Sequence, residues 1–178
     1  MRNSFIIFKK EIFPIGLILI LVFARLIPHP PNFTPIIAVA IVSSYFFKNI
    51  NLSLLTLLAA MLMSDLFIGL YENMIFVYAS LLLITFAFHK ISKKINFKNL
   101  FIYGFAGSLI FFIVSNFGVW ALGGLGVNDL AYEKSLEGLI ECYILAIPFF
   151  GNTFLSTIIF AYPAIFFYKS LAARASSR

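Results

Sequence analysis

The sequence predicts an all-α membrane protein with six transmembrane helices. Of its 178 residues, 62% are hydrophobic and only 11% are charged, whereas a soluble domain usually has about 25% charged residues. This excess of apolar side chains is unfavourable in water, so the bilayer is the expected solvent. The apolar residues also form continuous runs, unlike the alternating ten-residue segments of a membrane β-barrel. Both observations favour a helical bundle.

Six apolar segments make up one transmembrane domain over residues 1–178. They cover about residues 12–28, 35–47, 52–70, 74–89, 101–122 and 138–168. About 20 residues are needed to cross the bilayer core, so the second segment is short and needs shelter from its neighbours. The sixth segment has 31 residues and would reach about 46 Å as a single helix. We expect it to kink or break near Pro148 or Gly151-Asn152, because proline removes a helical hydrogen bond.

The basic residues are distributed unevenly between the two sides of six alternating spans. Eleven of the thirteen fall on the side of the termini: Arg2, Lys9, Lys10, Lys48, Lys90, Lys93, Lys94, Lys98, Lys169, Arg174 and Arg178. The opposite connections hold Lys134 among several carboxylates. The positive-inside rule therefore places both termini in the cytoplasm and the chain in the cytoplasmic (inner) membrane. These residues flank apolar spans and do not form one basic face, so no nucleic-acid partner is expected.

Polar side chains collect in the outer half of the predicted bundle. The candidate ligand-binding residues there are Arg25, Asp65, Asn116, Trp120, Glu141 and Tyr143. Asn116 and Trp120 share a helix face because they are four residues apart. Charges within a bilayer are costly and usually face a bundle interior or a water-filled cavity. Ligand pockets are mostly apolar, with a few polar groups. The pattern therefore predicts a pocket open to the outside.

All of these residues except Tyr143 also have a structural interpretation. Arg25 can extend its charge to the interface or pair with Asp65. Trp120 is typical of interfacial aromatic belts, and Asn116 is typical of hydrogen bonds between helices. Glu141 suits the first turns of a helix, where a negative charge is favourable. The sequence leaves both interpretations open for each position.

The segment RLIPHPPNFTPI (residues 25–36) is the predicted outer connection between the first two helices. Proline cannot continue a helix and restrains the residue before it, so we expect a stiff, extended segment. One interpretation is a rigid loop that ends two helices. The other is a wall of the pocket, in which His29 and Asn32 face the ligand. A wall is favoured over a moving lid because prolines limit flexibility.

Four stretches together resemble a family of small, uncharacterised membrane transport proteins: PHPPNFTPI, AMLMSDLFIG, FFIVSNFGVWALGG and GLIECYILAIPFFGNT. That family is similar to the substrate-binding (S) components of energy-coupling factor (ECF) vitamin transporters. The resemblance covers about residues 20–160. It implies an S-component-like bundle that binds a vitamin or related small micronutrient in an outward-facing pocket for uptake. It also implies, as partners, a coupling membrane subunit and ATPases that supply the energy.

The sequence departs from the S-component pattern in the first helix. S components often dock through an alanine-x-x-x-alanine face, whereas residues 12–27 contain only Gly16 and Ala24 as small residues of this kind. Solitary function is therefore an alternative. One vitamin-B12-binding type of S component directs a cysteine toward cobalt, which makes Cys142 a candidate corrinoid ligand. No other metal ligand and no cofactor are expected.

Two other functions compete with transport. The first is a membrane-embedded enzyme with Asp65, Glu141 or His29 as acid–base groups, and the second is a structural membrane subunit. The sequence contains no Gly-x-Ser-x-Gly, His-Glu-x-x-His or glycine-rich phosphate loop. We therefore expect a transport protein and not an enzyme.

Overall fold

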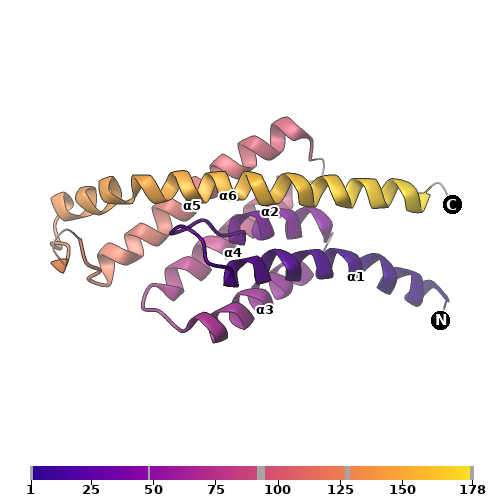
Figure 1. Ribbon diagram of the computed structural model, residues 1–178, viewed down its shortest axis with the longest axis horizontal. Helices are drawn as coiled ribbons and strands as arrows, with labels where there is room; N and C mark the ends of the chain where they lie inside the picture. Colours follow the sequence, from indigo (N-terminus) through magenta and orange to yellow (C-terminus); the bar gives the residue numbers. More distant parts are fainter. Residues whose placement is uncertain (1, 48, 92–94, 127–128, 177–178) are drawn as a thin grey trace.

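The computed structural model describes residues 2–47, 49–91, 95–126 and 129–176. Over these ranges the chain is all-helical, and Figure 1 shows its helices packed side by side. In chain order they are α1 (Arg2–Phe23), the 3-10 helix η1 (Ala24–Leu26), α2 (Ile36–Phe46), α3 (Ile50–Ile68), α4 (Met74–Ile91), α5 (Phe97–Ala121) and α6 (Leu136–Ser176). The predicted all-α class is confirmed. Four helices, α3 to α6, are long and apolar enough to cross a membrane.

The short helix α2 lies at the centre of the bundle. Residues 36–44 are all buried, and α2 contacts each of the other five α-helices. Its 11 residues reach only about 16 Å, well short of a bilayer core of about 30 Å. A helix that is apolar on every side must be covered on every side. The other helices provide the shelter that its sequence requires.

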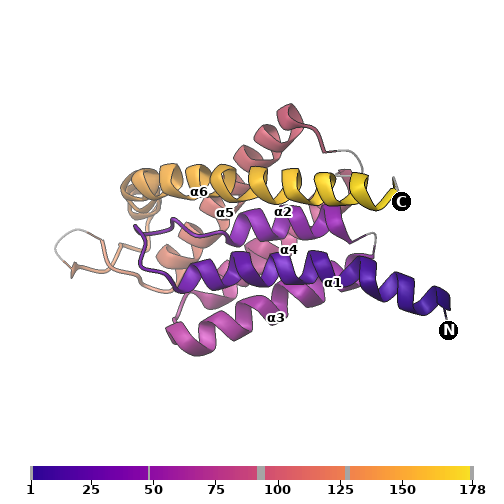
Figure 2. The same ribbon diagram turned by 45° about the vertical axis from the view of Figure 1, so that its right-hand side comes forward.

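The helix α6 continues through the region where a break was predicted. It is one helix of 41 residues, with Pro148 and Pro163 inside it. In Figure 2 its first turns, in orange, are seen nearly end-on while its yellow turns run across the view, so the helix bends. Membrane helices tolerate an internal proline because neighbouring groups can satisfy the freed carbonyl. Of the two predicted outcomes, a kink or a break, the helix does not break but bends and stays continuous.

Two asparagines start helices that begin at the same end of the bundle. The side chain of Asn49 accepts a hydrogen bond from the backbone of Asn51 before α3, and that of Asn96 accepts one from Asn99 before α5. Such caps satisfy backbone N–H groups that lack a partner in the first turn.

The helix α3 then ends at Gly69, whose φ of +103° is accessible to glycine.

The two ends of the bundle collect different parts of the chain. Figures 1 and 2 show the start of α1 beside the end of α6, whereas the connection from α5 to α6 lies at the opposite end. Among the basic residues used to predict orientation, Lys48, Lys93, Lys94 and Arg178 lie outside the described residues.

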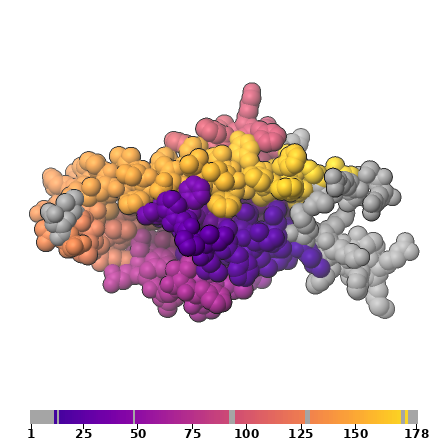
Figure 3. Space-filling view, viewed as in Figure 1, coloured from indigo at the N-terminus to yellow at the C-terminus, as the bar shows by residue number. Residues whose placement is uncertain are grey.

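The surface carries many large apolar side chains. Leu66, Phe67 and Ile75 are 78%, 74% and 76% exposed. Figure 3 shows one face of the molecule, formed mainly by α1, α3 and α6. Exposing apolar surface to water costs about 25 cal/mol per Å². Such a surface is favourable in lipid, in agreement with helices that cross a membrane.

Candidate functional site

Arg25 and Asp65 form a buried ion pair. Nη1 of Arg25 lies 2.6 Å from Oδ1 of Asp65, and the two side chains are only 9% and 1% exposed. The same nitrogen donates a hydrogen bond of 2.7 Å to the hydroxyl of Ser64. Oδ1 of Asp65 makes no aligned hydrogen bond, so its contact with Arg25 is a charge contact. The pairing that the sequence left as one alternative is present in the structure.

Two tyrosines complete this cluster. The hydroxyl of Tyr78, in α4, donates a hydrogen bond of 2.7 Å to Oδ2 of Asp65. Tyr71 lies in the connection before α4, where burial raises the pKa of its hydroxyl. The charge of Asp65 raises that pKa further, and Arg25 opposes the rise. We call Arg25, Ser64, Asp65, Tyr71 and Tyr78 the Arg25 cluster.

Three of these members were not predicted as site residues. They are Ser64, Tyr71 and Tyr78. Helical spacing gave no signal for the two tyrosines, because Tyr71 lies in the connection before α4 and only Tyr78 is in the helix. The cluster thus connects η1 to α3 and to the start of α4.

Asn116 and Tyr143, both predicted site residues, lie in the contact between α5 and α6. The hydroxyl of Tyr143 donates to the backbone carbonyl of Ile113 over 2.8 Å. The side-chain amide of Asn116 donates to the carbonyl of Phe112 in its own helix, also over 2.8 Å. The thiol of Cys142 is buried and donates to the carbonyl of Asn116 over 3.5 Å. Cys142 and Tyr143 therefore hold α6 to α5 through backbone oxygens, whereas the amide of Asn116 bonds within α5.

Trp120 is bound to the connection that follows its helix. Its indole Nε1 donates to the backbone carbonyl of Glu133 over 2.7 Å. The ammonium of Lys134 bonds the carbonyl of Trp120 and lies 5.4 Å from the centre of the indole ring, within the range of a cation–π contact. Trp120 therefore fixes the loop between α5 and α6 to the end of α5.

Glu141, another predicted site residue, is exposed near the start of α6.

The proline segment forms a defined turn and is not simply extended. The backbone N–H of Phe33 donates to the carbonyl of Pro30 over 3.0 Å, and Asn32 has a φ of +60°. This is the pattern of a type II turn, which favours proline at its second position and asparagine or glycine at its third. Pro31 and Asn32 occupy those positions. The turn chemistry is therefore in the sequence, although the expectation of an extended segment missed it.

This turn is bound to α6. The side-chain amide of Asn152 donates to the backbone carbonyl of Pro31 over 2.9 Å. The hydroxyl of Ser156 donates to the backbone carbonyl of Thr34 over 3.0 Å. His29 is exposed, and its ring nitrogens lie 2.9 Å and 3.2 Å from the carbonyls of Pro30 and Arg25. The segment thus links Arg25 to α6 through its own backbone.

Asn32 provides a test of the turn. Replacing it by alanine should lower the free energy of unfolding by about 1 kcal/mol, because a left-handed backbone is unfavourable for residues with a Cβ other than asparagine and aspartate. Replacing it by glycine should leave stability nearly unchanged. Melting of the two variants in detergent measures the difference. Equal melting temperatures would show that the turn is not required.

The predicted site residues do not form one hydrogen-bonded network in the described part of the chain. Within the described ranges, no hydrogen bond or ion pair links the Arg25 cluster to Asn116, Trp120 or Tyr143. A cavity of about 10 Å³ lies between α1 and α3 beside Ser64. It holds about one water molecule, whereas ligand pockets measure about 300–1,000 Å³. The Arg25 cluster is therefore closed.

Comparison with known proteins identifies a family whose function is unknown. The chain matches the model of a family of unknown function (DUF6580) over residues 6–177. No curated protein and no solved structure matches it.

Proposed function

The chain belongs to this family of unknown function, and from its geometry we propose that it is a membrane transport protein that binds a vitamin or related micronutrient from the outside. The Arg25 cluster carries the proposal. A guanidinium and a carboxylate are buried where apolar helices meet, and burial of charge is costly. An ionisable residue inside membrane helices is by default a candidate functional site.

The chemistry of Arg25 favours a ligand with a carboxylate. In the part of the chain that the structure describes, its side-chain contacts with Met61, Ser64 and Asp65 all involve Nη1, and the hydroxyl of Tyr71 also lies beside the guanidinium. The other guanidinium nitrogens can bind a planar anion through two parallel hydrogen bonds. A ligand carboxylate would then compete with Asp65 for Arg25. The hydroxyls of Tyr71 and Tyr78 would supply further polar contacts.

The proposal requires the cluster to open, because the cavity beside it holds no more than about one water. The elements above it are η1 and the proline segment, and the bonds from Asn152 and Ser156 hold that segment against α6. Opening would move η1 away from α3 and carry Arg25 with it. His29 and Asn32 lie in the proline segment and would line the entrance.

A six-span arrangement with both termini in the cytoplasm supports uptake from the outside. The end of the bundle that contains the start of α1 and the end of α6 has the excess of lysine and arginine. S components of this arrangement work with a coupling membrane subunit and ATPases. Solitary function remains the alternative, since α1 offers only Gly16 and Ala24 as small residues for docking.

Cysteine labelling tests this orientation. In a Cys142→Ala background, Asp129→Cys should react with a membrane-impermeant maleimide in intact cells, because its connection is predicted to be outside. Lys98→Cys should react only after the membrane is opened. Both positions are exposed in the structure, so a difference in labelling reports the side of the membrane and not burial within the protein. The reverse labelling pattern would overturn the topology.

Thermal stabilisation of the purified protein tests the ligand class. The probes are carboxylate vitamins beside their neutral analogues: nicotinate with nicotinamide, and pantothenate with pantothenol, together with biotin. A ligand at 100 times its dissociation constant adds about 2.7 kcal/mol of stability, and we expect this only for a carboxylate form. If the folded protein is stabilised by none of these compounds, or equally by a carboxylate vitamin and its neutral analogue, the proposed ligand chemistry is wrong.

A further inference from the structure

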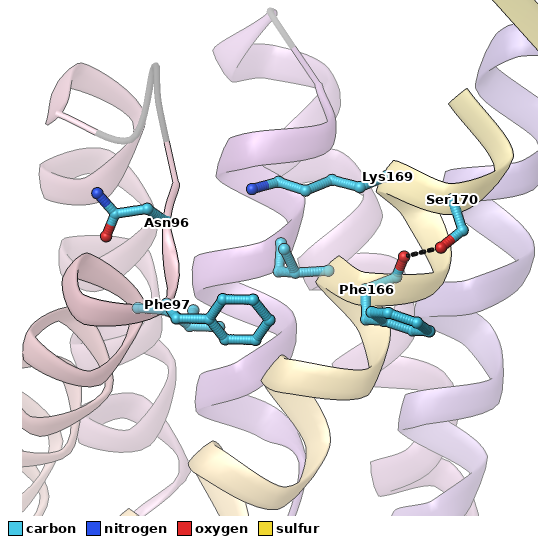
Figure 4. A pocket seen from close by; sticks show the side chains of 7 residues that line it. Asn96, Phe97, Phe166, Lys169 and Ser170 are labelled. Atoms are coloured by element: carbon cyan, nitrogen blue, oxygen red, sulfur yellow. Dashed lines mark hydrogen bonds between the residues drawn. The ribbon is translucent and has the colours of Figure 1, made fainter. Parts of the chain in front are cut away.

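A cavity of about 270 Å³ lies far from the Arg25 cluster, between the start of α5 and the last third of α6. Its apolar lining comes from Phe97, Leu100, Ile165 and Phe166, and Figure 4 shows Asn96 and Lys169 beside it. In that view the Nζ of Lys169 lies above the ring of Phe97, whereas the amide of Asn96 points away from Lys169. The cavity thus combines an apolar floor with the ammonium of Lys169 at one edge.

The donors at this edge are suited to an anion. The ammonium of Lys169 donates to the carbonyl of Ile95, which uses one of its three N–H bonds. The side chain of Asn96 caps α5, because its carbonyl oxygen accepts a hydrogen bond from the backbone of Asn99, so the donor at the cavity edge is Lys169. Lys98 is exposed in the first turn of α5, where the helix dipole also favours negative charge.

The surroundings of the cavity distinguish a lipid from a soluble anion. Phe97 and Phe166 are 64% and 57% exposed, so the apolar floor continues onto the lipid-facing surface of α5 and α6. This end of the bundle is rich in lysine and arginine, and Glu11 is the only carboxylate that the sequence places there. A free phosphate ion would gain nothing from the aromatic floor, whereas an acyl chain would cover it.

We propose that this cavity is a binding site for an anionic phospholipid. The phosphate contacts Lys169, and the first part of an acyl chain lies on Leu100, Ile165 and Phe166. Basic pockets between membrane helices on the cytoplasmic side are suited to acidic headgroups. The proposal requires that α5 and α6 cross a membrane, but it is independent of the ligand proposed for the Arg25 cluster.

Native mass spectrometry tests the proposal. The full chain is placed in nanodiscs of equal parts dioleoyl phosphatidylglycerol and dioleoyl phosphatidylcholine, which carry the same acyl chains. After the protein is released from the nanodiscs in the mass spectrometer, the wild type should retain phosphatidylglycerol in preference to phosphatidylcholine. Lys169→Gln should reduce that retention about fivefold. Lys90→Gln, which removes an equal charge from an exposed lysine on α4 over the Phe86 ring, should have no effect.

A second variant separates binding from folding. Asn96→Asp retains an N-cap acceptor for α5 but adds a negative charge to the lining of the cavity, so it should abolish the preference for phosphatidylglycerol while melting is unchanged. Three results would overturn the proposal: equal retention of both lipids by the wild type, equal effects of Lys169→Gln and Lys90→Gln, or full retention by Asn96→Asp. If soluble glycerol 3-phosphate displaces the lipid at equal concentration, the site recognises a phosphate group and not a lipid.

Discussion

Asp65→Asn and Arg25→Ala are each expected to lower the free energy of unfolding by about 3–5 kcal/mol, because removing one partner of a buried ion pair leaves the other charge unpaired. The loss is expected to be large because the side chain of Asp65 is only 1% exposed and that of Arg25 only 9%. Tyr78→Phe is the matched comparison. It removes one hydrogen bond to the same carboxylate and should cost about 1.5–3 kcal/mol. Denaturation in detergent measures all three variants.

Replacing both charges at once separates stability from binding. Arg25→Met/Asp65→Leu removes the pair without leaving a lone charge, and apolar replacements of a buried pair are often neutral or stabilising. This double variant should recover most of the stability that either single variant loses. If Asp65→Asn and Arg25→Ala were as stable as the wild type, the pair would not be buried as the structure places it.

Gly118→Ala is expected to disrupt the contact between α4 and α5. A Cβ atom at this position would lie 2.2 Å from Oδ1 of Asn73 and 2.3 Å from Cγ of Phe76. The start of α4 would have to move, which also removes the hydrogen bond of 2.9 Å from Asn73 to the carbonyl of Ser115. Overpacking costs about 1–3 kcal/mol, and the lost bond adds about 1 kcal/mol.

Gly16→Ala is the matched control for Gly118→Ala. It is the same substitution within a helix, but a Cβ at Gly16 meets nothing within 4 Å. Alanine there should be neutral or should stabilise the protein by about 0.4–1 kcal/mol. Melting of the two variants under the same conditions gives the comparison. Equal stability of the two would contradict the close approach of α4 and α5.

The helices could be predicted well from the apolar runs. The expected segment 74–89 is observed as Met74–Ile91, and 35–47 as Ile36–Phe46. The first helix begins at Arg2 and not near residue 12, because an apolar run marks the part that prefers lipid and not the part that is helical. Lysine and arginine are good helix formers, so a helix can extend through them beyond the membrane.

The candidate site could be predicted only in part. Helical spacing shows which residues share a face, and it placed Arg25 and Asp65 at similar depth. It does not show which neighbouring helix that face meets, so Tyr78 on α4 was missed as the partner of Asp65. Asn116 and Tyr143 were predicted to line a pocket, but their side chains bond backbone carbonyls of α5. Polar side chains in lipid bond the nearest available group, and sequence spacing does not identify it.

The central claim is that the Arg25 cluster binds a small molecule with a carboxylate. Native mass spectrometry of the gently purified protein, beside the Arg25→Met/Asp65→Leu variant, tests it most directly. The wild type should carry a co-purified small molecule with an acidic group. The folded double variant should lack it. The same bound mass on both proteins, or no bound small molecule on the wild type, would contradict the account.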